Sequence, residues 1–314
     1  MEINGINLDG LAHDATKIEF PDEVPGRVVH IDADFLAYQC SYEREPGTTS
    51  LSEMQGKADV AVRTLRALAG AEKAILHLTP HESNKGNRHA IAIQKEYQGN
   101  RKDKPKPLYL HAMRDYLGSN FDSMLGITHE ADDGMSSEQY KALADGRENL
   151  SVIATKDKDL NMVPGLHLHW DTGRIIHADW FGEVHLRARG SGAKVLDGYG
   201  QKFFWAQLLA GDSADNIQGL PKYTDPKVGK VKLCGPVLTA SLLEGCSTHR
   251  ECLELIVQQY KAYGEHTGFK HWETGADVPW QQVLFSEAQL LWMRRVPHDD
   301  IDVKRFFKEI KDNG

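Results

Sequence analysis

Short apolar runs recur along the first two thirds of the chain, and each predicts a strand. Residues 28–31 form a buried run that ends at Asp32, and residues 74–78 and 151–155 form two more runs of the same kind. Residues 166–170 alternate between apolar and polar positions, which predicts a later strand.

Helical spacing separates these strands. Residues 57–69 place their apolar side chains on one helical face, and residues 127–144 contain an acidic helix start followed by a helical run. Because strands and helices alternate, the pattern predicts an α/β fold with a central, mostly parallel sheet that is flanked by helices.

The pattern changes at both ends of this region. Residues 1–26 are polar, with prolines at 21 and 25, and predict an N-terminal extension. Beyond about residue 200, helices and Gly- and Pro-rich turns replace the strands. We therefore expect an α/β core over residues 27–200 and a helical region without clear strands over residues 201–314.

Composition places the chain among ordinary globular proteins, since 40% of its 314 residues are hydrophobic and 26% are charged. No apolar run approaches the roughly 20 residues that a membrane span requires. The first residues lack the basic start and apolar stretch of a secretory signal. We expect a cytoplasmic protein without membrane contact, and the spacing of the four cysteines matches neither a zinc site nor a disulfide framework.

The distribution of charge is more informative than the net charge of −8, which argues weakly against a protein that simply coats nucleic acid. From Lys85 to Lys106 there are seven basic residues and two acidic ones, so that this segment carries about +5 (seven minus two). Acidic residues gather elsewhere. This segregation fits an acidic metal pocket beside a basic surface that guides a nucleic-acid strand.

Pairs of carboxylates stand at the ends of the predicted strands and at helix starts. In parallel α/β sheets the carboxyl ends of the strands line one edge, where ligands bind, so three of the clusters are expected to converge there. The clusters are Asp32 with Asp34, Glu130 with Asp132 and Asp133, Asp157 with Asp159, and Asp212 with Asp215.

So many carboxylates in one place require a cation. Two like charges about 4 Å apart repel by about 4 kcal/mol at an effective dielectric constant near 20. Mg²⁺ and Mn²⁺ prefer all-oxygen ligands, and a pair of such ions can activate water and stabilise the leaving oxygen in phosphodiester cleavage. A single acidic pair is more often a helix cap or a solvated surface group. Four clusters together favour the metal site.

The ordered motifs of the chain resemble those of the phage and bacterial 5′-nucleases, the 5′-3′ exonuclease or flap endonuclease family. The likeness extends from about residue 28 to about residue 245, and its most specific element is the string that begins at Gly211. The motifs are Ile31-Asp32-Ala33-Asp34-Phe35-Leu36, Tyr97-Gln98-Gly99-Asn100-Arg101, Glu130-Ala131-Asp132-Asp133, Thr155-Lys156-Asp157-Lys158-Asp159 and Gly211-Asp212-Ser213-Ala214-Asp215-Asn216-Ile217-Gln218-Gly219-Leu220-Pro221.

The resemblance implies a PIN-like nuclease core and two or more Mg²⁺ or Mn²⁺ ions. The implied ligands are Asp32, Glu130, Asp132, Asp133, Asp157, Asp159, Asp212 and Asp215. It further implies a helical arch over residues 85–120, through which a single-stranded 5′ end threads. In that arch Arg101 would contact the scissile phosphate and Tyr97 would stack on a base. Either Lys95 or Lys102 would reach the same phosphate from a neighbouring turn. A half-buried structural role for Tyr97 is equally consistent with the sequence.

The resemblance implies a helix–three-turn–helix at about residues 205–245 that holds the duplex backbone, with a bound K⁺. Glycines there allow close approach to phosphate, and lysines surround them. The DNA-binding residues expected from the arch and this motif are Arg101, Lys102, Gly219, Lys222, Lys230, Lys232 and Gly235.

Three features depart from the family pattern. A further ligand Asp normally follows the second strand, but this chain has none between Leu78 and Glu82. Either His81 or Glu82 substitutes for it, or fewer ligands hold the metal. The Lys that usually follows the arch Tyr is replaced by Gln98. The loop between Pro221 and Gly235 is also longer than the usual hairpin.

The expected function is a metal-dependent 5′→3′ DNA exonuclease with flap-endonuclease and RNase H-like activity. Its substrates would be DNA with a 5′ end, flap or nick, and RNA–DNA hybrid. As a free-standing chain without a polymerase it resembles the phage type, which acts in DNA replication and recombination in the host cytoplasm, and we expect a monomer. The alternatives are a PIN-type ribonuclease and a non-catalytic DNA-binding protein. The Gly211 motif and the basic segment oppose the former, and the full set of acidic clusters opposes the latter.

Overall fold

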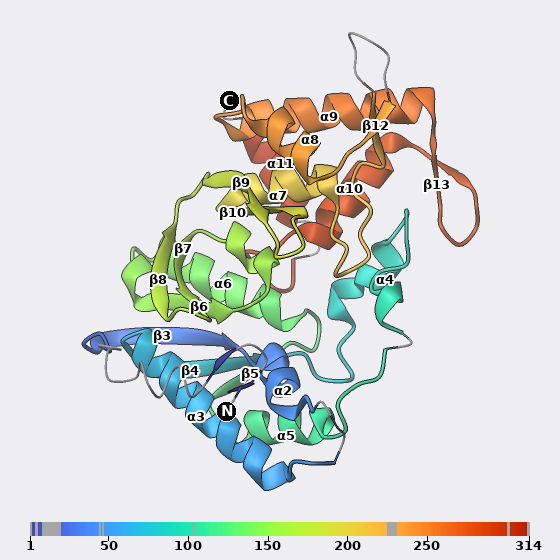
Figure 1. Cartoon of the computed structure of the whole chain (residues 1–314). Helices are drawn as coiled ribbons and strands as arrows, with labels where there is room; N and C mark the ends of the chain where they lie inside the picture. Colours follow the sequence, from blue (N-terminus) through green and yellow to red (C-terminus); the bar gives the residue numbers. More distant parts are fainter. Residues whose placement is uncertain are drawn as a thin grey trace. The chain divides into compact units, whose positions relative to one another are not determined.

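The computed structural model of the chain divides into two compact units (Figure 1). The residues that the structure describes are 2–3, 6–7, 20–43, 45, 47–102, 104–224, 231–299 and 302–312. The first unit consists of Met1–His81, Pro105–Asp157 and Gly165–His177, and the second of Glu82–Lys104, Lys158–Pro164 and Ala178–Gly314.

A six-stranded sheet in the order β5-β4-β3-β6-β7-β8 forms the centre of the first unit. The pairs β3–β4, β3–β6, β4–β5 and β6–β7 are parallel, as the sequence predicts. The strands are β3 (Val24–Asp32), β4 (Ala71–Leu78), β5 (Ser123–Leu125), β6 (Ser151–Thr155), β7 (Gly165–His169) and β8 (Arg174–Ala178). A separate hairpin joins β1 (Glu2–Ile3) to β2 (Ile6–Asn7).

Helices cover both faces of this sheet. The helices α2, α3 and α5 pack on one face through a continuous apolar core that includes Val29, Ile31 and Leu76, and α6 packs against β3, β4, β5 and β6. A capping box between Ser50 and Glu53 fixes the start of α3. The bounds are α2 (Ala33–Ser41), α3 (Leu51–Leu68), α5 (Leu110–Asn120), α6 (Ala131–Ala144) and the short η3 (Glu148–Leu150).

Apolar and polar side chains alternate along the end of β3. Val29 and Ile31 belong to the apolar core, and the residues between and after them, His30 and Asp32, are buried as well. His30 Nδ1 lies 3.0 Å from Nε2 of the buried His77 on β4. Burial lowers the pKa of His30 to about 4, so this pair is neutral near pH 7.

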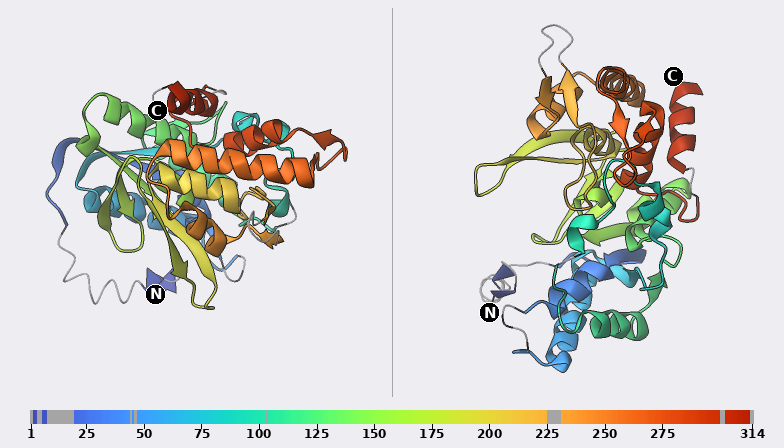
Figure 2. Two further views of the ribbon diagram at one scale, coloured as in Figure 1. Left: turned by 90° about the horizontal axis from the view of Figure 1, so that it is seen from above. Right: turned by 90° about the vertical axis from the view of Figure 1, so that its right-hand side faces the viewer.

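The second unit is built around α7, whose aromatic residues are buried on nearly all sides. Phe203, Phe204 and Trp205 pack among α8, α9 and α10, and α9 runs alongside α7 (Figures 1 and 2). The helices are η1 (Lys85–Asn87), α4 (Arg88–Ile91), η2 (Gly99–Arg101), η4 (Lys158–Met162), α7 (Gln201–Ala210), α8 (Pro236–Leu243), α9 (His249–His266), α10 (Trp280–Leu291) and α11 (Asp302–Asp312).

Short antiparallel hairpins accompany these helices. They pair β9 (Glu183–Ala188) with β10 (Lys194–Tyr199), β11 (Lys222–Thr224) with β12 (Val231–Leu233), and β13 (Phe269–Lys270) with β14 (Asp277–Val278). The expectation that no strands follow residue 200 was therefore wrong. Strands of two or three residues are too short to show the alternation by which strands are found in a sequence.

The long loop predicted between Pro221 and Gly235 corresponds to the β11–β12 hairpin, which lies between α7 and α8. Residues 225–230, including Lys230, lie outside the described residues.

The predicted arch, residues 85–120, contains three short helical turns followed by α5. The predicted domain ranges remain predictions. By packing, residues 82–104 and 158–164 belong with the C-terminal part of the chain.

Among the described helices, none combines the length and the apolar character that crossing a membrane demands.

Candidate metal centre

The first acidic cluster lies at the carboxyl end of β3 and the start of α6, within the first unit. Asp32 caps α2, because one carboxylate oxygen accepts the Phe35 N–H at 2.9 Å and the other accepts the Thr155 hydroxyl at 2.8 Å. Burial raises the pKa of Asp32 to about 6. The strand end and the adjacent β6 thus hold this carboxylate in one position.

Glu130, Asp132 and Asp133 open α6, as predicted. The Glu130 N–H donates to the Asp133 carboxylate at 3.3 Å, and the Ala131 N–H donates to the Thr79 hydroxyl at 2.9 Å. These bonds tie the helix start to the end of β4 and hold it in place.

Asp132 is the most perturbed carboxyl of this cluster. Burial raises its pKa well above the ordinary value, and the charges of Asp157, Asp32, Glu130 and Asp133 raise it further. A carboxyl in this position needs either a proton or a nearby cation. Asp32, Glu130, Asp133 and Asp157 thus all lie within electrostatic range of Asp132 in the first unit.

Asp34 belongs to the first predicted cluster but not to the implied ligands, and its carboxylate lies beside the end of β4. Asp34 accepts the Thr79 N–H at 3.0 Å and pairs with Arg114 on α5 at 3.0 Å. His81 and Glu82, the expected substitutes for the missing ligand, are exposed. From the first turn of α2, Asp34 thus places a carboxylate next to the residue that follows β4.

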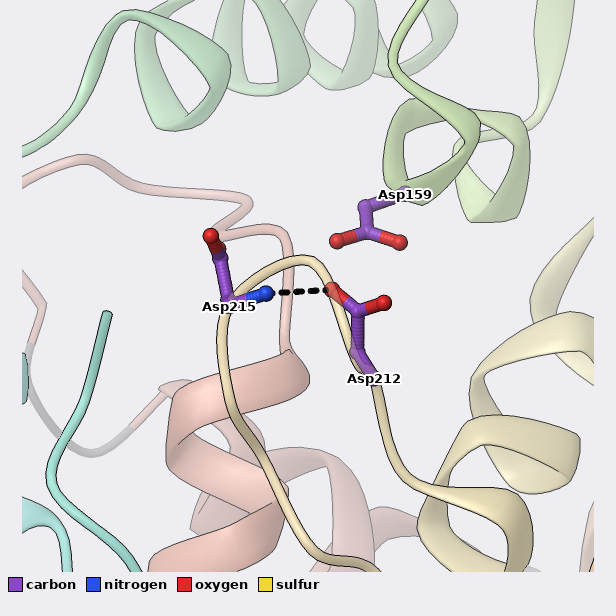
Figure 3. A group of neighbouring side chains, drawn as sticks. All are labelled: Asp159, Asp212 and Asp215. Atoms are coloured by element: carbon purple, nitrogen blue, oxygen red, sulfur yellow. Dashed lines mark hydrogen bonds between the residues drawn. The ribbon is translucent and has the colours of Figure 1, made fainter. Parts of the chain in front are cut away.

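The second cluster belongs entirely to the second unit and comprises Asp159, Asp212 and Asp215. One carboxylate oxygen from each lies within 4.8 Å of the others, which within the described part of the chain makes this the one such group of three or more possible ligands. Figure 3 shows Asp159 on the short helix η4 facing Asp212, with Asp215 on the same loop as Asp212. Asp159 and Asp212 are buried.

The loop that carries Asp212 and Asp215 closes on itself. Asp212 and Ile217 exchange two backbone hydrogen bonds, of 2.9 and 2.7 Å, and the Asp212 carboxylate accepts the N–H groups of Ala214 and Asp215. Gly219 has a φ of +63°, and a Cβ there would lie 2.3 Å from the Gly211 nitrogen. Glycine is therefore required where the two ends of the loop meet.

Lys158 neutralises part of this cluster. Its ammonium lies 2.7 Å from Asp159 and 2.8 Å from Asp212. Burial alone would lower the pKa of Lys158, but the two carboxylates outweigh burial and raise it. Burial raises the pKa of Asp159 to about 6, whereas Lys158 and the two loop N–H groups outweigh burial at Asp212 and hold its pKa below the ordinary value.

Asp215 is surrounded by the segment that was predicted to be the arch. The Tyr97 hydroxyl donates to its carboxylate at 3.1 Å, the Gln98 amide donates to it at 3.2 Å, and Arg101 forms an ion pair with it. Tyr97 is only 2% exposed, so almost none of its ring is accessible for stacking on a base in this structure. Of the two roles considered for Tyr97, base stacking and a structural role, the structural role agrees with this environment.

Glu287 on α10 supports the loop from the other side. It accepts the Gly219 N–H at 2.7 Å, and the Gln94 amide donates to the Gly219 carbonyl at 2.7 Å. Burial raises the pKa of Glu287 to about 7. No local pattern predicts this residue's role, because 68 positions separate it from Gly219.

The remaining predicted DNA-binding residues are spread over the second unit. Lys95 and Lys222 are exposed, Lys102 pairs with Glu96, and Gly235 is the N-cap residue of α8. Lys230 lies outside the described residues, as does the side chain of Lys232. These assignments stay predictions.

Comparisons with known proteins agree with the predicted family likeness. No protein-family model matches the chain. A curated 5′-3′ exonuclease of Buchnera aphidicola subsp. Schizaphis graminum (strain Sg) is 32% identical over 138 residues, which are 41% of this chain and 43% of the relative. The match therefore spans less than half of the relative's own length.

Two solved structures resemble most of the chain. One is the phage T5 D15 protein co-crystallised with metal ions, with a TM-score of 0.52 over 91% of this chain and 98% of that chain, at 14% identity. The other, a variant of the T5 D15 flap endonuclease in a pseudo-enzyme–product complex with DNA and metal ions, aligns with the same values. The predicted fold class is thus confirmed, and so is the resemblance to the 5′-nucleases.

Proposed function

We propose that the chain is a divalent-metal-dependent nuclease that hydrolyses phosphodiesters at 5′ ends, flaps and nicks of DNA. The observation that carries this proposal is the carboxylate group Asp159, Asp212 and Asp215, whose oxygens lie close enough together to share one cation. The fold shared with the T5 D15 structures supports it, since those proteins were crystallised with metal ions.

The donor set fits Mg²⁺ or Mn²⁺. Every candidate ligand in both clusters is a carboxylate, and hard divalent ions prefer oxygen donors. The raised pKa values of Asp32, Asp132 and Asp159 are expected where acidic groups are arranged for a cation. When bound, a pair of such ions would lower the pKa of a water molecule and stabilise charge on the phosphate and on the leaving oxygen.

The residues of this chain then have separate tasks. Asp32, Asp34, Glu130, Asp132, Asp133 and Asp157 would hold cation in the first unit, and Asp159, Asp212 and Asp215 in the second. Arg101 would turn from Asp215 to the scissile phosphate when DNA is present, because a guanidinium can make two parallel hydrogen bonds to phosphate. Tyr97 and Gln98 would keep Asp215 in position.

The duplex would be held by groups that contact phosphate without reading sequence. Lys95, Lys102, Lys222, Lys230 and Lys232 would supply charge, and Gly219 and Gly235 would allow close approach of the backbone, with K⁺ at the helix–three-turn–helix. RNA–DNA hybrid as a second substrate, action as a monomer, and primer removal in phage replication belong to the same proposal.

One experiment tests the reaction and its substrate together. A 5′-labelled flap, a nicked duplex, an RNA–DNA hybrid and a single-stranded RNA would be incubated with the protein in Mg²⁺ and in EDTA. We expect cleavage of the flap and the nick in Mg²⁺ and none in EDTA. Cleavage of single-stranded RNA alone would favour a PIN-type ribonuclease, and binding of the flap without any cleavage would overturn the proposal.

Asp157→Ala provides the matched variant. It should reduce flap cleavage by about 100-fold or more, since it removes a candidate ligand, and should leave flap affinity in Ca²⁺ largely unchanged. Arg174→Ala, an exposed substitution on β8, is the control and should cut like the wild-type protein. Equal loss of affinity and cleavage in Asp157→Ala would contradict its assignment as a ligand.

A further inference from the structure

Lys158 stands in the middle of the second acidic cluster, with an acid of the motif on either side of it in sequence. The ammonium lies 2.7 Å from one oxygen of Asp159 and 2.8 Å from one oxygen of Asp212. It also lies 6.0 Å from the centroid of the Phe203 ring. An ammonium in contact with two carboxylates and near an aromatic face is favourably placed.

The two carboxylates need this charge in the absence of another cation. The Asp159 side chain is 10% exposed and that of Asp212 is 1% exposed, whereas the Lys158 side chain is 43% exposed. Buried acids cannot be neutralised by solvent, but a lysine stem that reaches the surface can carry its ammonium in or out without unfolding.

The ammonium contacts the same carboxylates that form the candidate cation site. Asp159, Asp212 and Asp215 make up that site, and Lys158 takes an oxygen from two of the three. Gln207 also donates to the Asp159 oxygen that Lys158 contacts, which leaves this oxygen fully occupied. A divalent cation that used these oxygens would have to displace the ammonium.

We propose that Lys158 is a built-in counter-cation that competes with divalent metal for Asp159 and Asp212. It keeps the cluster assembled when metal is absent and leaves it when metal binds. The inference deepens the proposed function and rests on it, because it assumes that this cluster takes up metal. As a consequence, Lys158 stabilises the metal-free protein and lowers the affinity of the site for metal.

The test compares Lys158→Met with the wild-type protein in two measurements, both at pH 8 so that the carboxylates are ionised. Thermal unfolding in EDTA should show a melting temperature about 3–6 °C lower in the variant, because the two acids then repel without compensation. Titration with MnCl2, followed by the electron paramagnetic resonance signal of free Mn²⁺, should show one class of site tightened roughly tenfold.

Two further variants keep the result interpretable. Lys156→Met removes the same side chain two positions earlier, where it pairs with Asp171 outside both clusters, and it should change neither measurement by much. Lys158→Arg keeps the charge and should behave like the wild-type protein in EDTA. If Lys158→Met is unfolded in EDTA but regains its melting transition in MnCl2, the proposal is supported.

Other outcomes overturn it. Mn²⁺ affinity that is unchanged or weaker in Lys158→Met would mean that Lys158 does not compete with metal. If the wild-type protein binds Mn²⁺ and cuts the flap, such a result removes only this inference. A wild-type protein that binds no Mn²⁺ would overturn the proposed function and this inference with it.

Discussion

The two acidic clusters of the molecule differ in how the repulsion among their carboxylates is reduced. In the first unit, Asp132 lies among four other acids, and both burial and their charges raise its pKa. In the second unit, Lys158 contacts Asp159 and Asp212, and Arg101 pairs with Asp215. One cluster would retain protons in the absence of metal, whereas the other is neutralised by basic side chains of the chain itself.

The number of acids therefore does not by itself predict how strongly a cluster attracts metal. A metal ion that binds a protonated carboxyl must displace the proton, so its affinity depends on pH. A metal ion that displaces an ammonium group has no such dependence below the high pKa of lysine. The first cluster should therefore gain metal affinity as pH rises, and the second should respond less. Each prediction below alters one side of this contrast.

The largest effect is expected from Asp132→Asn. Flap cleavage should fall by about 1000-fold, because Asp132 is a proposed ligand of the cation that would stabilise charge on the reacting phosphate. In EDTA the variant should be at least as stable as the wild-type protein, and its advantage should grow with pH. The wild-type acid has a raised pKa when folded, so its contribution to stability is present at low pH and is lost as pH rises through that value.

Single-turnover cleavage and thermal unfolding between pH 5 and pH 9 measure both effects. Asp145→Asn, at the exposed end of α6, is the control and should alter neither. A variant that is less stable than the wild-type protein at pH 9 in EDTA would show that the first cluster is not strained by repulsion.

Asp212→Asn should have the opposite effect on metal-free stability. It removes one partner of Lys158 and weakens the hydrogen bonds from Ala214 and Asp215, so unfolding in EDTA should become easier by about 1–3 kcal/mol. Urea unfolding in EDTA measures the change. If Asp212→Asn and Asp132→Asn shift stability in the same direction, the contrast between the clusters is wrong.

Glu287→Gln should give a smaller, pH-dependent change. The Glu287 pKa is about 7 in the folded chain against an ordinary 4.5, so its contribution to stability is fully present below about pH 4.5 and is lost as pH rises through 7. Glutamine does not titrate. The variant should therefore gain stability relative to the wild-type protein as pH rises from 4.5 to 8.

Urea unfolding at these two pH values tests this prediction, with Glu265→Gln on the exposed surface of α9 as the control. A stability difference that does not vary with pH would mean that Glu287 keeps an ordinary pKa beside Gly219.

The sequence predicted the parallel sheet because its strands are buried on both faces and read as uninterrupted apolar runs. Residues 151–155 form a strand with the bounds that were expected, and α6 begins at the predicted acidic start. The acids at the ends of these elements followed from the same reasoning, since a strand end fixes where the next side chain lies.

The missed features depend on contacts between distant residues. The position of Asp34 beside the end of β4 depends on the Thr79 N–H and on Arg114, which contact its carboxylate. Glu287 reaches the loop of Asp212 and Asp215 from a helix much later in the chain, and burial of Tyr97 is set by packing that no local pattern reveals. Lys158 was visible within the acidic motif, but its contact with Asp212 was not.

The interleaving of the two compact units has a practical consequence for dissecting the protein. Their six segments alternate along the chain, so the backbone passes from one unit to the other five times, once through the peptide bond between Asp157 and Lys158. No single truncation point can yield either half as an independent fragment. Cleavage by a protease at one exposed loop should give a nicked molecule that stays joined, and variants of each cluster are best studied in the intact chain.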